Sequence, residues 1–342
     1  MPARIPGKYL SVSKIHNVEK IMESSSKQKD IDVLGFGMIV YDVFAKPLDT
    51  VPDWGRLVTF DEIAHNVGGC PVNTSVDLAR LGARVMIGGC IGADPAGNTV
   101  REKLKEAGLD VGGLTAVEGS STAFTFVAIG SDGQRRYFHT VGANASLSDM
   151  YCQDSMLKRS KILHIGGTLL MPGFDGDPTA RLLKRAKNLG LITSMDTAFN
   201  PGADALSLVK PCLKYLDIFI PSIEEAELIS GETDPEEILN TMDGEGVPIV
   251  GIKLGAEGSV VRAEGKTYWV PPFKVRPVDT TGAGDAFMAG FLYGTLQDWP
   301  IEKRARFANA VAAICIQAVG CSTSIVAADK VLDFMEKTEQ VK

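Results

Sequence analysis

Two aspartates, Asp279 and Asp285, bracket a run of small and hydroxylated residues in the segment DTTGAGDAF, near the C-terminal end of the chain. Gly282 and Gly284 allow a backbone turn that residues with a Cβ atom resist, and an apolar helical pattern begins directly after them. The first N–H groups of a helix have no partner within it and carry the positive end of the helix dipole, so the turn forms an anion site. Phosphoryl transfer to a hydroxyl needs such donors, together with a carboxylate that takes the proton.

The same segment is also compatible with a plain helix start. In that interpretation Thr281 is the N-cap and Asp285 only complements the helix dipole. Caps built from small residues are common, so the segment alone favours this simpler interpretation. Only the rest of the chain separates the two.

A second glycine-containing segment, GGCPVNTS at residues 68–75, lies far upstream and is followed by GGCIG at residues 88–92. Together with DTTGAGDAF, these segments resemble the two signature regions of the ribokinase-like carbohydrate kinases, the PfkB family. The resemblance runs from about Ile31 to about Val326. It implies an ATP-dependent kinase that transfers the γ-phosphate to a hydroxyl group, expected to be a primary one, of a small sugar or sugar acid.

The resemblance also implies roles for residues in and around DTTGAGDAF. Asp285 is expected to be the catalytic base, and the amides of Gly282, Ala283 and Gly284 are expected to hold the γ-phosphate. Many family members bind a monovalent cation, usually potassium, beside this segment. The matching positions are Asp279, Thr281, Cys315, Ala318, Gly320 and Ser324.

The segment PSIEEA at residues 221–226 resembles the place where the family usually has Asn-x-x-Glu, whose acid helps to place hydrated Mg²⁺ near the phosphates. Glu225 keeps the acid, while Ser222 stands in the place of the Asn. Serine retains an oxygen but is shorter, so a water molecule could fill the gap. The pair is also a good capping box for a helix, and both interpretations can hold at once.

Residues matched to the nucleotide site follow an apolar stretch. The segment KLGAEG, with Lys253, Gly255 and Gly258, resembles the family's loop beside the base and ribose, and Asn309 matches a position that often contacts adenine. Glycines there would let a flat ring approach the backbone closely. Each match is weak on its own, because the glycines could form an ordinary turn and Asn309 could face solvent.

The positions matched to the sugar site are Asp42, Gly69 and Asn73. Asp42 matches the strand-end acid that binds sugar hydroxyls, although alone it could be a turn residue. A buried hydroxyl left without a partner costs about 1–3 kcal/mol, so vicinal hydroxyls need paired donors and acceptors. Val40 stands where ribokinase itself has a sugar-binding Asn, and Cys70 replaces its Lys. Ribose is therefore less expected, and no other sugar is identified.

An arginine pair, Arg135 and Arg136, follows a turn signal at residues 131–133. The pair could meet the carboxylate of a substrate, as in 2-keto-3-deoxygluconate kinases, or a second phosphate. An Arg pair beside an exposed turn is more often only solvated. The sequence leaves these three interpretations open.

The elements that have to position these residues alternate, from Ile31 onward, between short β-branched apolar runs and amphipathic stretches, which is typical of parallel β-α-β units. The predicted fold class is α/β: a doubly wound, mainly parallel sheet flanked by helices, ribokinase-like, with a small β-strand lid. Predicted strands span 31–39, 84–92, 160–170, 191–197, 215–222 and 247–255. Predicted helices span 73–82, 96–108, 177–190, 224–230, 234–243, 283–296 and 301–319.

The predicted domain organisation is one kinase domain, 31–342, after a polar tail at residues 1–30 that is expected to be mobile. The segments 41–66 and 115–142 break the alternation of strands and helices and predict the lid. Ligands of an open parallel sheet bind outside the carboxyl ends of its strands, so the lid is expected to cover that edge.

The composition restricts the partners and the compartment. A net charge of −7 argues against a surface built for nucleic acid or for anionic lipid. The expected partners are therefore a small sugar and ATP, with Mg²⁺ and potassium as the ions that the resemblance implies. The six cysteines form no C-x-x-C pair and no zinc-type spacing, which predicts reduced thiols and a cytoplasmic location.

Two alternative functions stay open. A nucleoside kinase of the adenosine type shares the fold and the GAGD loop, and a non-catalytic member would only bind a sugar or nucleotide. Such a member is expected to lose the base or the glycines, and this chain keeps both. The resemblance also implies a homodimer that forms through the lid strands, whose exposed edges give dimerisation a physical motive.

Overall fold

The strand β1 (Ile31–Gly37) is apolar and buried along almost its whole length, as expected for a parallel strand that is covered on both faces. The computed structural model, which describes residues 29–341, places β1 in a nine-stranded sheet of order β13-β12-β11-β10-β9-β8-β1-β4-β5. The other strands are β4 (Val85–Gly92), β5 (Asp110–Val117), β8 (Ser160–Thr168), β9 (Ile192–Thr197), β10 (Ile218–Phe219), β11 (Ile249–Lys253), β12 (Ser259–Ala263) and β13 (Lys266–Val270). All pairings from β5 to β11 are parallel, and β12 and β13 extend the sheet antiparallel.

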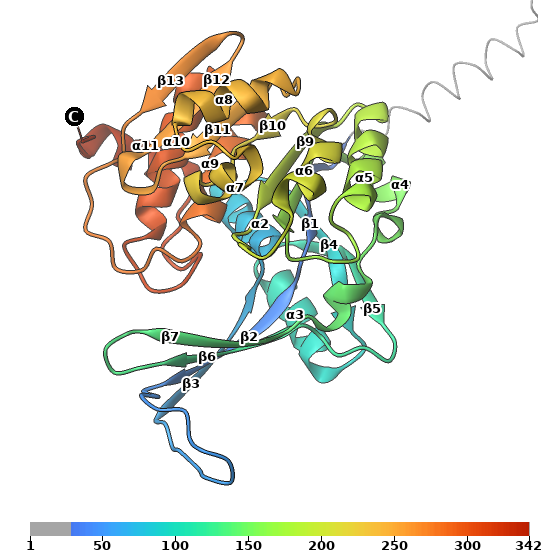
Figure 1. Cartoon of the computed structure of the whole chain (residues 1–342), viewed down its shortest axis with the longest axis vertical. Coiled ribbons are helices and arrows are strands. Elements are labelled where there is room, and N and C mark those ends of the chain that lie inside the picture. The colour runs from blue at the N-terminus through green and yellow to red at the C-terminus, as the bar shows by residue number, and fades with distance from the viewer. Residues whose placement is uncertain (1–28, 342) are drawn as a thin grey trace, which may run out of the picture.

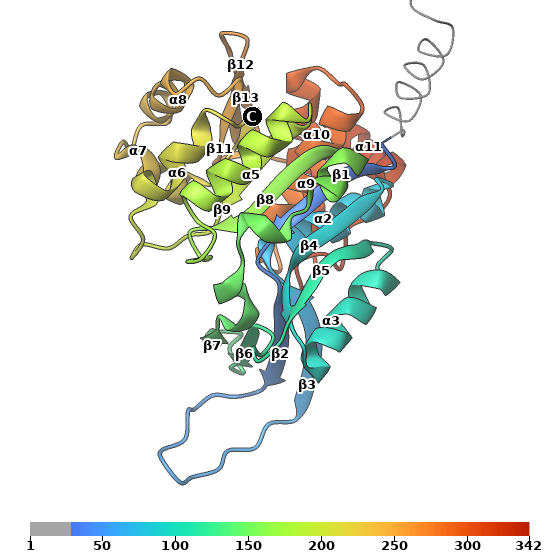
Figure 2. The same cartoon turned by 90° about the vertical axis from the view of Figure 1, so that its right-hand side faces the viewer.

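Two layers of helices cover the two faces of this sheet, as Figure 2 shows. One layer contains α4 (Asp154–Arg159), α5 (Asp177–Asn188), α6 (Ala205–Leu213), α7 (Ile223–Ser230) and α8 (Pro235–Gly244). The other contains α2 (Cys70–Leu81), α3 (Pro95–Glu106), α9 (Ala283–Leu296), α10 (Ile301–Cys315) and α11 (Ala328–Lys337). Each layer closes its own apolar cluster against the sheet, with Phe36 and Phe219 fully buried on one side and Phe291 on the other. The sheet is therefore a rigid support for the loops at its edges.

Helix α2 shows how local signals set an element and what the element then positions. Pro71 lies in its first turn, where the missing N–H costs no hydrogen bond, and Gly82 ends it in a left-handed conformation. Val72, Leu78 and Leu81 form its buried face. Because this face packs α2 beside β1 and α9, the segment GGCPVNTS lies next to the start of α9.

The lid is a separate four-stranded sheet of order β3-β2-β6-β7 that projects from the body in Figure 1. Its strands are β2 (Val40–Lys46), β3 (Glu62–Gly68), β6 (Phe124–Ile129) and β7 (Arg135–Thr140). Its own buried cluster holds only Ala45, Leu48 and Ala128, with Val58 and Phe126 partly buried against it. The lid is therefore thin, and much of its apolar surface is exposed.

The predicted α/β architecture with a small lid is confirmed, and α9 has the predicted bounds, 283–296. Three predicted segments need correction. The segment 215–222 forms only the two residues of β10, and the helix predicted over 301–319 ends at Cys315, before a turn in which Gly320 has a positive φ of 98°. Residues 115–117 belong to β5 in the main sheet, so the second lid segment begins with β6.

Three helices, one strand and one hairpin were not predicted: α4, α6, α11, β5 and β12–β13. Helix α6 contains Pro211 in its interior, which obscures its pattern in the sequence. The short helical turns η1 (Gly142–Ser146), η2 (Asp149–Tyr151) and η3 (Gly255–Glu257) complete the described elements. Of the predicted tail, residues 1–28 lie outside the described part of the chain. Among the described helices, none is long and apolar enough to cross a membrane.

Candidate active site

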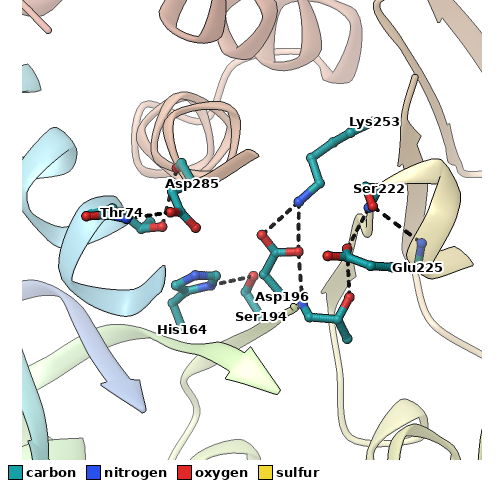
Figure 3. Close-up of polar contacts among 10 residues, drawn as sticks. Thr74, His164, Ser194, Asp196, Ser222, Glu225, Lys253 and Asp285 are labelled. Atoms are coloured by element: carbon teal, nitrogen blue, oxygen red, sulfur yellow. Dashed lines mark hydrogen bonds and ion pairs between the residues drawn. The ribbon is translucent and has the colours of Figure 1, made fainter. Parts of the chain in front are cut away.

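Polar side chains from four neighbouring parallel strands meet at one edge of the sheet, beside the start of α9 (Figure 3). His164 comes from β8, Asp196 from β9, Ser222 follows β10, and Lys253 ends β11. The next strands along the chain lie on opposite sides of β1: β4 on one side and β8 on the other. The direction in which strands are added therefore switches at β1, the neighbour of β8. Ligands of open α/β sheets bind in the crevice at such a point.

The first turn of α9, where an anion hole is predicted, has the backbone geometry that such a site needs. Gly282 has φ 81°, and a Cβ atom there would lie 2.6 Å from the Cβ of Cys321, so only glycine fits. Among the described residues, the N–H groups of Gly284 and Asp285 have no acceptor, while the N–H of Ala283 donates to the Thr280 carbonyl at 3.2 Å. Two free amides at a helix N-terminus are therefore available to an anion.

Asp285 lies beside these amides and is held by α2. The Nδ2 of Asn73 donates to its Oδ2 at 2.8 Å, and Thr74 Oγ1 donates to its carbonyl at 3.3 Å. Enclosure by protein atoms raises the pKa of Asp285 to about 6, against the opposing effects of Asn73 and Lys253. A carboxylate with this pKa is ionised near neutral pH and is a stronger base than an exposed aspartate.

Lys253 lies on the other side of these free amides. A Cβ atom built on Gly284 would lie 3.3 Å from Lys253 Nζ, and the same Nζ bonds both oxygens of Asp196, at 2.8 and 2.7 Å. Both side chains are nearly buried, with exposed fractions of 11% and 3%. Burial alone would lower the pKa of Lys253, but Asp196 and Glu225 hold it above its usual value. A fixed positive charge therefore lies next to the free amides.

Glu225 is the third carboxylate of the site. Its Oε2 accepts from the backbone N–H of Ser222 at 2.8 Å and from Thr197 Oγ1 at 2.9 Å. The predicted capping box is present, because Ser222 Oγ also accepts from the N–H of Glu225. Both donors bond Oε2, which leaves Oε1 open to a water molecule.

These carboxylates fit Mg²⁺ that is held through water. Within residues 29–341, no group of three or more ligating side chains could hold a metal ion directly. Asp196, Glu225 and Asp285 together carry more negative charge than Lys253 neutralises. Because Mg²⁺ usually keeps several of its waters, outer contacts of this kind suit an ion that arrives with nucleotide phosphates.

The residues predicted for the nucleotide come from three places. Lys253 ends β11, Gly255 begins η3 and Gly258 follows it, and Asn309 lies on α10. Gly255 has φ 57° with open space around it, whereas a Cβ atom on Gly258 would lie 2.2 Å from the Val270 carbonyl oxygen. Asn309 is buried, and its Nδ2 donates to that same carbonyl at 2.9 Å. The alternative that Asn309 faces solvent is therefore wrong; a contact with adenine stays a prediction.

The residues predicted for the sugar lie where the lid meets the body. Asp42 is on β2, and burial raises its pKa to about 6. Gly69 has φ 106°, and a Cβ atom there would lie 2.3 Å from the Met38 carbonyl oxygen. Asn73 bonds Asp285, so one of its two amide hydrogens is already used. Their contacts with a sugar stay predictions.

The six positions matched to a monovalent cation form one cluster between α9 and the end of α10. Gly320 N donates to Asp279 Oδ2, Ser324 Oγ donates to the Cys315 carbonyl, and the Cys315 thiol lies 3.8 Å from the Thr281 carbonyl. The N–H of Ala318 also points to the Cys315 carbonyl. The carboxylate of Asp279 has no oxygen lone pair left for a bound cation, because its two oxygens already accept four hydrogen bonds.

Sequence reasoning missed two residues that the structure brings into the site. Asp196 is the next-to-last residue of the buried strand β9, and an acid at a strand end is also the pattern to which Asp42 was matched. His164 is the second of these residues; its Nδ1 lies 3.2 Å from Ser194 Oγ, and its buried Nε2 has no partner among the described residues. Burial lowers the pKa of His164 to about 3, so the ring is neutral. No local signal distinguished it from a core histidine.

A doubly wound sheet with a lid, a helix N-terminus with free amides, and a basic carboxylate beside it define a phosphotransferase that acts on a small molecule. The family model described as "pfkB family carbohydrate kinase" matches residues 30–328. A ribokinase of Haemophilus influenzae is 29% identical over 314 residues, covering 90% of this chain and 99% of the relative. A 5-dehydro-2-deoxygluconokinase of Clostridium perfringens is 28% identical over 335 residues, covering 94% and 97%. The solved structure of Arabidopsis thaliana ribokinase, complexed with ribose and ATP, has a TM-score of 0.78 at 23% identity and covers 90% of this chain and 99% of that one.

The chain belongs to the pfkB family of carbohydrate kinases. It is a carbohydrate kinase.

Proposed function

We propose that this kinase transfers the γ-phosphate of ATP to a hydroxyl group of a small sugar or sugar acid, with Asp285 as the base. The supporting observation is the position of Asp285 in the first turn of α9, beside two free amides and with a raised pKa. The hydroxyl proton passes to the Asp285 carboxylate while the oxygen attacks the γ-phosphorus, and the bond from this phosphorus to the bridging oxygen of ATP breaks to release ADP. The amides of Gly284 and Asp285 and the ammonium of Lys253 hold the charge on the transferring group.

Asn73 and Thr74 support the role of Asp285 as the base, because both side chains bond Asp285 and fix its position. Asn73 fixes one oxygen of Asp285, which leaves Oδ1 to face an incoming hydroxyl group. The predicted contacts of Gly69 and Asn73 with the sugar, and of Asp42 with its hydroxyls, belong to this proposal. Asp42 is supported by its place on the lid-side strand β2 and by its enclosure, which suits a carboxylate that binds buried hydroxyls.

The proposed cofactors are ATP and Mg²⁺. When bound, Mg²⁺ would neutralise the negative charge that develops on the phosphates. Glu225 and Asp196 would orient its water shell, and Lys253, Gly255, Gly258 and Asn309 would line the nucleotide. Potassium is not part of this proposal, because Asp279 already has four hydrogen-bond donors.

The acceptor is identified by measuring ADP release over pentoses, ketohexoses, 2-keto-3-deoxy and 5-dehydro-2-deoxy sugar acids, sugar phosphates and nucleosides. We expect a sugar or sugar acid to give the highest kcat/KM, since relatives of this chain are named as kinases of both classes. A nucleoside as the best acceptor would replace this assignment with the nucleoside kinase. Tight binding without transfer to any acceptor would favour the non-catalytic function.

The pH dependence of kcat tests the base. Because the pKa of Asp285 is raised to about 6, we expect kcat at saturating substrates to fall below pH 6, approaching tenfold per pH unit as the carboxylate takes up a proton. Asp42 has a similar pKa, so the Asp42→Asn variant is the control and should keep the acidic limb. A profile that stays flat down to about pH 5 would contradict Asp285 as the base.

The homodimer is proposed on one face of the lid. Cross-strand pairing places Ile63, Ala45, Ala128 and Arg136 in one row, and Phe138 two residues along the same face of β7. Ile63 and Phe138 are 56% and 48% exposed, which is unusual for large apolar side chains on a thin sheet. We expect the chain to elute at twice its mass and the Ile63→Lys/Phe138→Lys variant to elute as a monomer, by light scattering after size exclusion. A wild-type monomer at micromolar concentration would contradict the proposal.

We also propose that the enzyme works in the cytoplasm. All six cysteines are free, and Cys90, Cys152, Cys212 and Cys315 are buried. Free thiols are typical of a reducing compartment.

A further inference from the structure

One side chain of the lid reaches the loop that precedes α9. Arg135, at the start of β7, donates through Nη1 to Thr281 Oγ1 at 2.8 Å and through Nη2 to Asp279 Oδ2 at 2.9 Å. The partners are separated by more than 140 residues in sequence, so the contact exists only because the fold brings the start of β7 beside the loop before α9. It joins the lid to the segment whose amides form the anion hole.

The contact completes the hydrogen bonding of Asp279. Its Oδ1 accepts from the N–H of Thr281 at 3.0 Å and from Thr281 Oγ1 at 2.6 Å, and its Oδ2 accepts from Arg135 and from the N–H of Gly320 at 3.1 Å. A carboxylate has about four lone-pair sites, and all of them are used. Burial alone would raise the pKa of Asp279, but these donors hold it well below its usual value. The group is therefore a carboxylate with no site left for a further ligand.

A charge at this place needs a counter-charge. The side chain of Asp279 is 8% exposed, and an ionised carboxylate that is so enclosed is costly unless it is paired. Arg135 is the one cationic side chain that bonds it among residues 29–341. Its guanidinium is planar and always charged, and it spans Asp279 and Thr281 with two parallel N–H groups, a geometry that lysine does not have.

We propose that Arg135 takes the place of a monovalent cation in this kinase: its guanidinium supplies the counter-charge of Asp279 and so fixes the anion-hole loop, residues 279–285. This inference rests on the proposed function for its catalytic consequence, and it replaces the potassium ion that the sequence resemblance implied. Because Arg135 belongs to the lid, the element that is expected to cover the substrate also supplies the counter-charge of Asp279.

The neighbouring arginine provides a matched control. Side chains alternate along β7, so Arg135 shares the face of the lid that carries Asp42, whereas Arg136 lies on the opposite face. Among the described residues, Arg136 donates only to the Asp49 carbonyl, within the lid, at 3.3 Å. The two residues have the same charge and the same strand, and they differ in whether they reach the loop.

The test measures thermal unfolding of the full chain in KCl and in N-methyl-glucamine chloride of equal ionic strength, without nucleotide or sugar. We expect the Tm of the wild type and of Arg136→Ala to be the same in both salts. Arg135→Ala leaves Asp279 with room for an ion, so its Tm should be lower and should recover in KCl. A potassium-specific rise in the wild-type Tm, or an Arg135→Ala protein that is indifferent to potassium, would overturn the proposal.

Activity is the second readout, with the acceptor that the ADP-release measurements identify. We expect wild-type kcat to be independent of potassium and Arg135→Ala to lose roughly ten- to hundredfold in kcat, the range for a lost charged hydrogen bond, with recovery in KCl. Arg135→Lys keeps the positive charge but loses the two-pronged guanidinium, so its kcat should lie between those of the wild type and Arg135→Ala. If Arg135→Ala does not fold, the test rests on the kcat of the wild type and of Arg135→Lys. Activation of wild-type kcat by potassium would refute the proposal. The Tm measurement needs no turnover, so failure of the proposed kinase function is recognised separately.

Discussion

The Asp285→Asn variant is expected to lose about 10²–10⁴-fold in kcat, the usual contribution of a positioned general base. Asparagine has the same shape and keeps an oxygen for the bond from Asn73, so the anion hole and the binding of ATP should be preserved. At pH 8 the neutral amide also removes a charge whose enclosure is unfavourable, as the raised pKa indicates. We therefore expect no loss of Tm. The measurements are kcat with the identified acceptor and thermal unfolding at the same pH.

The same substitution at a remote helix start is the control. Asp234 caps α8 through the N–H groups of Glu236 and Glu237, far from the site, and asparagine is an equally good N-cap. Asp234→Asn should keep full activity and stability. An Asp285→Asn enzyme with wild-type kcat would show that another group removes the proton.

The Lys253→Met variant is expected to lose both activity and stability. The ammonium lies beside Gly284 and pairs with the buried carboxylate of Asp196. Its removal leaves that charge unpaired, which costs roughly 3–5 kcal/mol of unfolding free energy. It also removes positive charge next to the transferring phosphoryl group, so kcat should fall by about 10²-fold or more.

The stability loss should depend on pH with a definite sign. Burial and the nearby Glu225 raise the pKa of Asp196 above its value in the unfolded chain, and loss of Lys253 raises it further. The folded state then binds a proton more tightly than the unfolded state, so the loss is small at low pH and grows as the pH rises through the folded pKa. Urea unfolding at about pH 5 and at about pH 8, on either side of neutrality, measures this difference.

A double variant separates the two effects of Lys253. Lys253→Met/Asp196→Asn removes both charges and should regain most of the stability but not the activity. The Lys187–Asp217 pair at the surface is the matched control, because both of its partners are partly exposed. Lys187→Met should cost less than about 1 kcal/mol and leave kcat unchanged. Full activity in the double variant would show that Lys253 acts only by neutralising Asp196.

DTTGAGDAF carries most of its local structure in its own residues. The positive φ of Gly282, the acid in the first turn and the apolar continuation are all local signals, and α9 accordingly has the predicted bounds. The same holds for the capping box of Ser222 and Glu225. Signals that act within three or four residues can be interpreted without the fold, because the atoms that interact are close along the chain.

Elements with weaker local signals were predicted poorly. The segment 215–222 is apolar, but only two of its residues pair with both neighbours in the sheet. Pairing depends on where β9 and β11 end, which the segment itself does not encode. Helix α6 was missed because its interior proline contradicts local propensity, and tertiary packing of Val209, Cys212 and Leu213 outweighs that conflict.

The sequence by itself determined the family, the α/β sheet with its lid, and Asp285 as the candidate base. The tertiary structure alone decided which partners surround that base: Asn73 from 212 residues upstream, and Lys253 with Asp196. It also decided that Arg135 is not merely solvated, since its side chain bonds Asp279 and Thr281. The physical reason is that charge pairing and enclosure depend on distances between elements that are remote in sequence, and only the packed sheet, helices and lid set those distances.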